Sequence, residues 1–150
     1  MHTYDIQLRR TDIDAQQHLN NVVFAQYLDE ARSDLLGRYE SLAGSHESLP
    51  GSHESLPAGH ESGGAPWRVV VAGQRLSYRM PLLFRAAPVT VTSVVERIGT
   101  TSFTLAHEVR DAEYLYLSAT STLVAIDGGA PRPLTRGERE YLMTLAAPPA

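Results

Sequence analysis

Two hydrophobic periods divide the chain, a helical one near its start and an alternating one in its second half. Residues 4–8 alternate apolar and polar side chains and predict a first β-strand. Residues 22–39 then carry apolar side chains at helical spacing, with Asn20 or Asn21 suited to cap the helix and Gly37 near its expected end. The apolar face of this helix consists of Phe24, Tyr27, Leu28, Ala31 and Leu35.

The second half of the chain has the period of two that is typical of half-buried strands, interrupted by turns that contain glycine or proline. A short terminal helix over residues 136–145 has Thr135 as its cap and Glu138 in the position that completes a capping box. A strand, a long helix and then successive strands predict the α+β class, with one strongly curved antiparallel sheet covering the helix. The later strands are expected over residues 75–80, 89–96, 103–110 and 115–126.

One segment differs from the rest of the chain in composition. From Glu40 to about Ser62 a seven-residue repeat reads ESLAGSH, ESLPGSH and ESLPAGH. A seven-residue period is typical of coiled coils, but each copy holds a single leucine together with glycine or proline, which interrupt helices. We therefore predict a single domain over residues 1–150 with a flexible repeat loop at about 40–62.

The amino-acid composition excludes several classes of protein and of catalytic site. The 150 residues carry a formal net charge of -4, no cysteine and, among 13 basic residues, no lysine. Disulfides, iron–sulfur clusters, cysteine nucleophiles and Schiff-base lysines are therefore excluded, and the charge does not favour nucleic-acid binding. No apolar run reaches the roughly 20 residues that span a bilayer, and residues 1–10 lack the apolar stretch of a signal peptide. We expect a soluble, cytoplasmic protein.

The six histidines are the candidate bases or metal ligands that composition leaves. His2 lies at the terminus and is expected to be unstructured, and His107 lies on the apolar face of its strand, where packing is the commoner role. Three others are copies of one His-Glu pair in the repeat, and closing that loop on a metal would cost chain entropy, so we expect no metal site there. They are His46, His53 and His60. His18 is the histidine whose surroundings indicate chemistry.

His18 belongs to the densest polar cluster of the sequence, residues 12–21, which reads DIDAQQHLNN and lies directly before the long helix. A helix start presents unpaired N–H groups that can bind an anion or a developing oxyanion. A carboxylate beside such a start can attack a carbonyl or activate water, and together these are the parts that acyl transfer requires. The same residue types also build an ordinary turn and helix cap, so the residues alone leave both interpretations open.

The stretch R-x-T-D-x-D-x-x-x-H-x-N-N, followed by an amphipathic helix containing Y-L-D-E-A-R, resembles the N-terminal motif of hotdog-fold thioesterases. The similarity is to the 4-hydroxybenzoyl-CoA thioesterase-like group and its acyl-CoA thioesterase relatives, and the order of later strands extends it over most of the chain. It implies a hotdog fold, in which a long central helix is wrapped by a curved antiparallel sheet of about five strands. It also implies a homodimer or homotetramer with sheets paired edge to edge and active sites at the interface. We expect that edge at the long apolar strand over residues 115–126.

The resemblance also implies roles for individual residues of the cluster. Asp14, the second aspartate, matches the catalytic carboxylate of the family, acting as nucleophile or as general base. Asn21 matches the helix-start position whose backbone N–H helps to form the oxyanion hole, and His18 and Asn20 match residues that position groups and activate water. Asp12 is expected to be structural and to accept hydrogen bonds from backbone amides in the turn.

Further residues are candidates for substrate contacts. The aromatic ones could line an acyl pocket or pack in the core, and a Thr-Ser pair could touch the pantetheine arm or only form a turn. Four arginines could bind the phosphates of coenzyme A or lie on the solvent-exposed face of a strand. The candidates are Phe24, Tyr27, Tyr78, Thr101 and Ser102, and the arginines are Arg68, Arg75, Arg79 and Arg85.

The resemblance and the cluster together favour hydrolysis of an acyl-CoA or acyl-carrier-protein thioester without a metal or other cofactor, coenzyme A being part of the substrate. A non-catalytic acyl-thioester-binding module of the same fold is the alternative, because a fold alone does not establish an activity. A hotdog hydratase or dehydratase is a further alternative, although residues 13–15 lack the asparagine and proline of the motifs that those relatives usually carry.

Overall fold

A computed structural model gives the fold of the chain and describes residues 1–44 and 67–147. Its elements are β1 (His2–Ile6), a short 3-10 helix (Arg10–Asp12), α1 (Asn21–Gly44), β2 (Val69–Tyr78), β3 (Val89–Ile98), β4 (Ser102–Arg110), β5 (Leu115–Asp127), β6 (Ala130–Pro131) and α2 (Arg136–Thr144). The sheet has the strand order β1-β3-β4-β5-β2, with every neighbouring pair antiparallel and the short β6 paired to β5.

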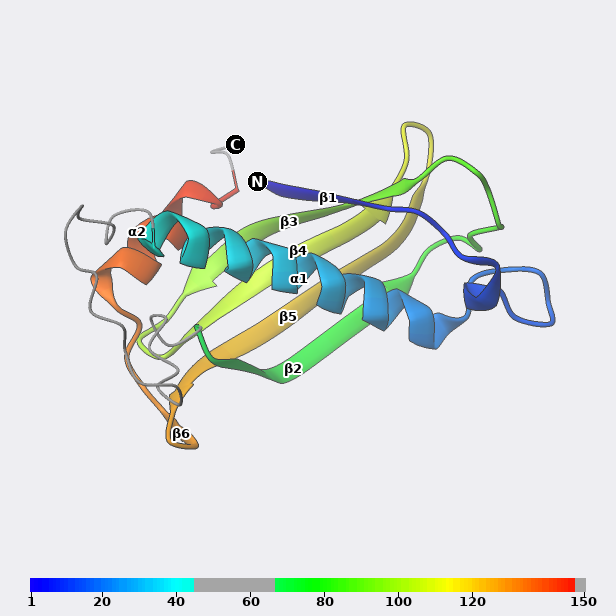
Figure 1. The fold of residues 1–150 in the computed structure, drawn as a ribbon. Helices are drawn as coiled ribbons and strands as arrows, with labels where there is room; N and C mark the ends of the chain where they lie inside the picture. The colour runs from blue at the N-terminus through cyan, green and yellow to red at the C-terminus, as the bar shows by residue number, and fades with distance from the viewer. Residues whose placement is uncertain (45–66, 148–150) are drawn as a thin grey trace, which may run out of the picture.

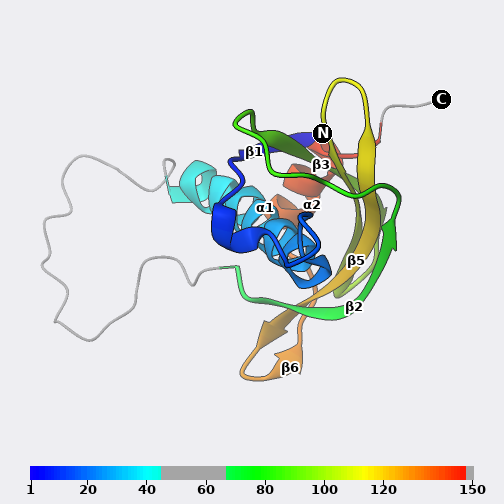
Figure 2. The ribbon, with the colours of Figure 1, turned by 90° about the vertical axis from the view of Figure 1, so that its right-hand side faces the viewer.

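The sheet curves around α1, which lies along its concave face (Figure 1, Figure 2). The predicted α+β class and the curved antiparallel sheet around a long helix are therefore confirmed. α2 begins with the expected capping box between Thr135 and Glu138, and the Tyr141 hydroxyl donates to the Leu35 carbonyl at 2.6 Å, which ties α2 to α1. Within the described residues, no helix is both apolar enough and long enough to cross a bilayer.

The edge of the sheet lies at a different strand from the one expected. β5 pairs with β4 on one side and β2 on the other, so the prediction of an edge over residues 115–126 is wrong. From Leu117 onward, β5 alternates buried and half-buried residues, as an antiparallel strand with one face on the core does. The two edge strands are β1 and the ten-residue β2. Most residues of β2 are exposed, including Val70 at 45% and Val71 at 44%.

α1 is longer than the sequence pattern predicted. It continues past Gly37 to Gly44, so the start of the expected loop at 40–62 is helical. A glycine inside a helix costs only about 1 kcal/mol, and the last turns gain support because Glu40 Oε1 accepts the Trp67 N–H at 2.9 Å. The remaining residues of the repeat, with its three histidines, lie outside the described part of the chain.

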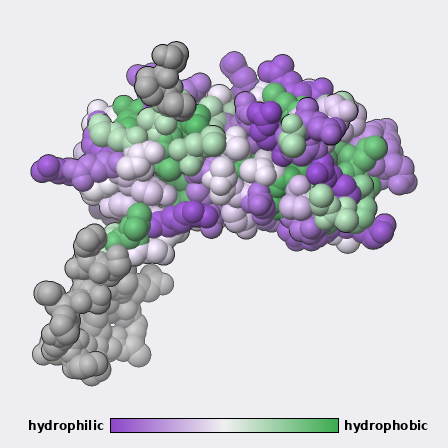
Figure 3. Space-filling view, turned by 90° about the horizontal axis from the view of Figure 1, so that it is seen from above, coloured by the Kyte–Doolittle hydropathy of each residue, from purple (hydrophilic) through white to green (hydrophobic). Residues whose placement is uncertain are grey.

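Two hydrophobic clusters fill the space between α1 and the sheet. One includes Leu28 and Val91 near the start of α1, and the other includes Leu35 and Phe103 toward its end. On the face shown in Figure 3, hydrophobic patches alternate with hydrophilic residues. The large, fully buried apolar side chains are instead concentrated between α1 and the sheet.

A row of polar side chains crosses the sheet between the two clusters. The strand register places His2, Ser93 and His107 side by side on β1, β3 and β4, and it pairs Ser121 with Gln74 on β5 and β2. We call this row, together with Arg32 of α1, the polar belt. The expectation that His2 is unstructured is wrong, because its pairing in β1 buries it to 4% exposure and its Nε2 lies 2.7 Å from Asp34 Oδ2.

Hydrogen bonds run along the polar belt and fix the state of His107. Arg32 Nη1 donates to Gln74 Oε1 at 2.7 Å and to Ser121 Oγ at 3.1 Å, and the Ser121 hydroxyl donates to Gln74 at 3.1 Å. Ser121 Oγ can then only accept from His107 Nε2, 3.1 Å away. Because burial lowers the pKa of His107, its Nδ1 carries no proton at neutral pH and accepts from the Ser93 hydroxyl at 2.8 Å. His107 is therefore a neutral, buried structural residue, as its position on an apolar strand face predicted.

His107 makes stability depend on pH. Burial, with smaller contributions from the Arg32 and His2 charges, lowers the pKa of His107 from 6.5 to about 4. The stability that neutral His107 contributes is complete above pH 6.5 and is lost as the pH falls toward 4, because the unfolded chain takes up the proton more readily. Between about pH 7 and pH 5, urea unfolding should show the non-titrating His107→Gln variant losing about 2 kcal/mol less than the parent. Equal losses would contradict a neutral buried His107.

Candidate active site

The polar cluster before α1 forms a loop that backbone hydrogen bonds hold against the segment after β2. The Leu19 N–H donates to the Leu82 carbonyl at 2.8 Å, and His18 pairs with Leu83 in an isolated antiparallel bridge. Leu19 itself is only 2% exposed and belongs to the core. The loop is therefore fixed by packing on one side, which sets the positions of the residues on its other side.

Asp12 anchors the base of this loop. Its carboxylate, in a residue that is 8% exposed, accepts the Tyr27 hydroxyl at 2.7 Å and the Arg9 N–H at 3.1 Å, while its carbonyl accepts the Asn20 N–H at 3.1 Å. Burial and the Asp12 carboxylate raise the pKa of Tyr27. The expectation that Asp12 is structural is confirmed. Tyr27, 1% exposed, packs in the core beside it.

Asp14 and His18 meet at the surface of the loop. Asp14 Oδ1 accepts the Gln16 N–H at 2.9 Å and the His18 N–H at 3.5 Å, and it lies 3.8 Å from His18 Nδ1. Gln17 has a φ of 72°, a strained conformation that closes this tight turn. The two side chains are 30% and 33% exposed, so a carboxylate and an imidazole face each other within reach of a substrate.

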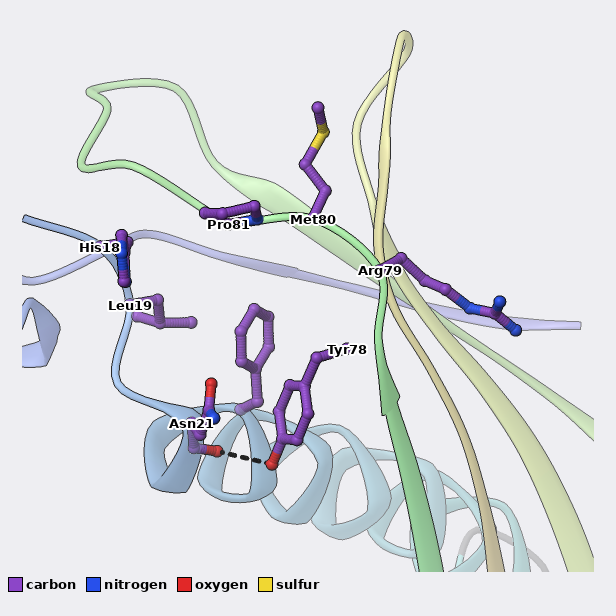
Figure 4. Close-up of a pocket in the computed structure, with 8 residues that line it drawn as sticks. His18, Leu19, Asn21, Tyr78, Arg79, Met80 and Pro81 are labelled. Atoms are coloured by element: carbon purple, nitrogen blue, oxygen red, sulfur yellow. Dashed lines mark hydrogen bonds between the residues drawn. The ribbon is translucent and has the colours of Figure 1, made fainter.

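The start of α1 is capped and still offers a donor. Asn20 Oδ1 accepts the Val22 N–H at 2.9 Å, which confirms Asn20 as a helix cap. None of the described residues accepts a hydrogen bond from the Asn21 N–H. The Asn21 carbonyl accepts the Tyr78 hydroxyl at 3.3 Å, which links α1 to the end of β2 (Figure 4). The first turn of α1 therefore presents an N–H and the positive end of the helix dipole beside this contact.

A cavity of about 190 Å³ opens at this point between the loop, α1 and the segment after β2 (Figure 4). The rings of Phe24 and Tyr78, two of the expected substrate contacts, lie on its wall with centroids 5.8 Å apart. Asp14 stands outside this wall, next to His18, which is part of it. The cavity is lined by His18, Leu19, Asn21, Phe24, Tyr78, Arg79, Met80 and Pro81.

The structure brings together only some of the expected substrate-binding residues. Thr101 and Ser102 lie at the opposite end of the sheet from His18, since Ser102 pairs with Val124 and the Thr101 carbonyl accepts the Ala125 N–H. Within one chain, these two residues therefore serve the turn before β4. Leu19, Met80 and Pro81 also line the cavity but do not stand out in the sequence, where the nearest signal is that Met80 and Pro81 come two and three residues after Tyr78.

The four arginines proposed for phosphate binding lie in different parts of the structure and do not form one cluster. Arg79 lines the cavity, but its side chain points away from the helix in Figure 4 and its Nε donates to Ser118 Oγ at 3.0 Å. Arg85 is paired with Asp111, whose pKa is lowered by its hydrogen bonds from Tyr116 and the backbone and by Arg85. Arg75 is exposed on β2, and Arg68 lines a second cavity described below. Among residues 1–44 and 67–147, no three His, Asp or Glu side chains are grouped as a metal site.

The comparison with protein families gives the same assignment as the motif. The model of the thioesterase-like superfamily matches residues 8–141. The chain belongs to the thioesterase-like superfamily. Its fold is the hotdog fold, as the resemblance in the sequence implied. A search of curated proteins gave no match.

Solved structures described as thioesterases align over nearly the whole chain. A predicted thioesterase from Bacillus stearothermophilus is 21% identical, with a TM-score of 0.76 and coverage of 99% of this chain and 98% of that one. A thioesterase from Thermus thermophilus, in complex with coenzyme A and Zn, is 24% identical, with a TM-score of 0.74 and coverage of 99% and 96%. A probable thioesterase from Escherichia coli is 22% identical, with a TM-score of 0.71 and coverage of 98% and 100%. At these identities the likeness establishes the hotdog fold.

The hydrogen bond from Tyr27 to Asp12 should contribute measurably to the free energy of unfolding of this thioesterase-like domain. Tyr27→Phe leaves the buried carboxylate with one donor fewer and should lower the free energy of unfolding by about 2 kcal/mol in urea titrations. Tyr114→Phe, at a residue that is 47% exposed, is the matched control and should change little. Equal stability of the two variants would show that this bond does not anchor the loop.

Proposed function

We propose that the protein hydrolyses acyl-CoA or acyl-carrier-protein thioesters at the start of α1. The observation that carries the proposal is the placement of the Asp14 carboxylate and the His18 imidazole on a fixed loop beside the first N–H groups of α1. Membership of the thioesterase-like superfamily supports it, and so does the match of Asp14, His18, Asn20 and Asn21 to the motif of that fold.

The proposed reaction uses only groups that the loop and the helix provide. The Asp14 carboxylate attacks the thioester carbonyl or removes a proton from the attacking water, while the Asn21 N–H and the helix dipole stabilise the oxyanion. His18 orients the carboxylate or the water, and Asn20 holds the helix start. The C–S bond breaks, water supplies the new oxygen of the acid and the proton of the thiol, and no metal or other cofactor takes part.

Coenzyme A is the proposed carrier of the acyl group. The Thermus thermophilus neighbour is described as a complex with coenzyme A, and it aligns with 99% of this chain. The small cavity beside Asn21 has aromatic walls from Phe24 and Tyr78 that suit the start of an acyl chain or the pantetheine arm. An acyl-carrier protein presents the same pantetheine arm, so the same site serves either thioester.

We further propose a homodimer, or a tetramer built from such dimers, in which β2 pairs with β2 of a second copy. β2 ends the sheet and its far edge pairs with no described strand, although ten residues of extended backbone are available there. Exposed Val70 and Val71 make an isolated edge prone to association, and two-fold pairing closes it. Antiparallel pairing also sets the start of one β2 beside the end of the other, so each Tyr78 cavity would lie at the interface.

Light scattering tests this assembly. At micromolar concentration the protein should have at least twice the 16.4 kDa mass of one chain, because the β2 edge and its apolar residues are buried only on pairing. A mass of 16.4 kDa at that concentration would contradict both the dimer and the interface location of the site.

Asp14 is tested by thiol release from a panel of acyl-CoA esters. Asp14→Asn keeps an oxygen for the turn bonds to Gln16 and His18 but removes the charge, and it should lower kcat/KM by about a hundredfold or more, as should Asp14→Ala. Asp127→Asn, at an exposed residue that ends β5, is the matched control and should retain full activity.

The outcomes separate the proposed function from its alternative. Full activity in Asp14→Asn and Asp14→Ala would remove the proposed mechanism. A parent protein that releases no thiol from any ester, yet binds acyl-CoA saturably, would instead be an acyl-thioester-binding module.

A further inference from the structure

A second cavity lies between α1 and the start of β2, away from the loop that holds Asp14. Its volume is about 360 Å³, within the usual range for small-molecule sites. One wall is a stripe of α1 at helical spacing, and the other is built from β2 and β5. The cavity is lined by Asp29, Arg32, Ser33, Leu36, Trp67, Arg68, Val69, Val71, Leu123 and Ile126.

Arg32 gives this cavity a buried positive charge, in a lining that is mainly apolar but also includes Asp29, Ser33 and the exposed Arg68. The residue is 6% exposed, and burial lowers the pKa of its guanidinium. Its Nη1 bonds go to neutral acceptors, Gln74 at 2.7 Å and Ser121 at 3.1 Å. A buried charge is stabilised chiefly by a nearby opposite charge, and neutral acceptors compensate it only in part.

The carboxylate that Arg32 contacts in the described chain is a weak partner. Asp29 Oδ1 lies 3.4 Å from Arg32 Nη2, which is long for a charge-assisted hydrogen bond, and the Asp29 side chain is 74% exposed. Water screens a carboxylate in that position and competes for it. A ligand anion that reached Nη2 from inside the cavity would meet less screening than Asp29 does.

Trp67 forms part of the cavity wall, and its indole also packs against aromatic rings of the core. The residue is 5% exposed and lines the cavity, yet its Nε1 N–H has no acceptor among the described residues. Buried N–H groups in folded proteins are almost always paired. The Nε1 atom is buried in the wall, so Arg32 is the donor that a ligand in this cavity would reach.

We propose that this cavity binds a carboxylate at the end of an aliphatic chain, with the carboxylate on Arg32 and the methylenes against Leu36, Val69 and Leu123. A simple alkyl end would leave the guanidinium desolvated without a counter-ion, whereas a terminal carboxylate supplies one. The substrate class that follows, and which rests on the proposed thioesterase function, is the CoA monothioester of a dicarboxylic acid.

The proposed dimer connects this cavity to the reacting carbonyl. The cavity lies at the start of β2 and the Tyr78 cavity at its end. In an antiparallel β2 pair the start of one strand adjoins the end of the other, so the second cavity of one copy would adjoin the Asp14 loop of the other. Arg32 itself lies deeper, beside Gln74 near the middle of β2. An acyl group held by its thioester at one copy then extends toward the carboxylate site of the other.

Tryptophan fluorescence tests the binding site without turnover. Trp67 is the single tryptophan of the chain and lines the cavity, so its emission reports occupancy. Hexanoate and hexanol are matched probes with one alkyl chain and different end groups. We expect saturable binding of hexanoate about tenfold or more tighter than that of hexanol, since a charge-assisted pair adds to the same apolar contact.

Two substitutions locate the anion. Arg32→Met should abolish the preference for hexanoate over hexanol. Asp29→Asn, at an exposed position that should leave the fold intact, removes the competing carboxylate and should tighten hexanoate binding several-fold. Glu140→Gln, on the exposed outer side of α2, is the control and should behave as the parent.

The proposal is overturned if hexanoate and hexanol bind the parent equally, if neither changes the emission of Trp67, or if Asp29→Asn leaves hexanoate binding unchanged. The substrate class is tested separately by kcat/KM for adipoyl-CoA and hexanoyl-CoA, with preference for adipoyl-CoA expected in the parent and lost in Arg32→Met. Hydrolysis of both esters at equal kcat/KM would overturn that class. Hexanoate binding without hydrolysis of any ester would overturn the proposed function and leave the anion site in place.

Discussion

The hydrogen bonds from Arg32 to Gln74 and Ser121 set where α1 lies on the sheet, and both cavities depend on that position. Apolar contact between a helix and a sheet is not directional and would tolerate sliding along the helix axis. A guanidinium that must meet acceptors on β2 and β5 tolerates far less. The polar belt thus fixes the position of α1 along the sheet, at a point between the two hydrophobic clusters. The hydrogen bond from Tyr27 to Asp12 adds a second constraint near the helix start.

With its position on the sheet fixed, α1 contributes residues to both cavities, one at the end of β2 and one at its start. Its first turn lies beside Tyr78 and the Asp14 loop, where the proposed mechanism has the thioester carbonyl polarised and attacked. About eleven residues further on, roughly 16 Å along the axis, Arg32 provides the charge of the second cavity. A single chain holds these two sites at a distance, and the proposed two-fold pairing of β2 brings the site of one copy to the cavity of the other.

The sequence predicted the start of α1, the strands β3 to β5 and the capped loop, because their signals are local. The strand expected over residues 75–80 is β2, which begins earlier, at Val69. Alternation marked β3, β4 and β5, and Asn20 and Thr135 marked the two helix starts. Strand order is not a local property, so the edge was assigned to residues 115–126 and not to β2.

The burial of His2 could not be predicted for the same reason, because it follows from the pairing of His2 with Ser93 on a strand that is distant in the sequence. The polar belt left a trace in the sequence, since Ser93 and Ser121 stand at inward positions between apolar residues, but nothing in the sequence joined them to Arg32.

The central claim is that the thioester carbonyl is bound at the start of α1 beside Asp14. A crystal structure of the Asp14→Asn protein with an intact acyl-CoA tests it most directly. The account predicts that the thioester oxygen accepts a hydrogen bond from the Asn21 N–H and that its carbonyl carbon faces the residue 14 side chain. A thioester bound elsewhere in the fold, with the start of α1 empty, would contradict it.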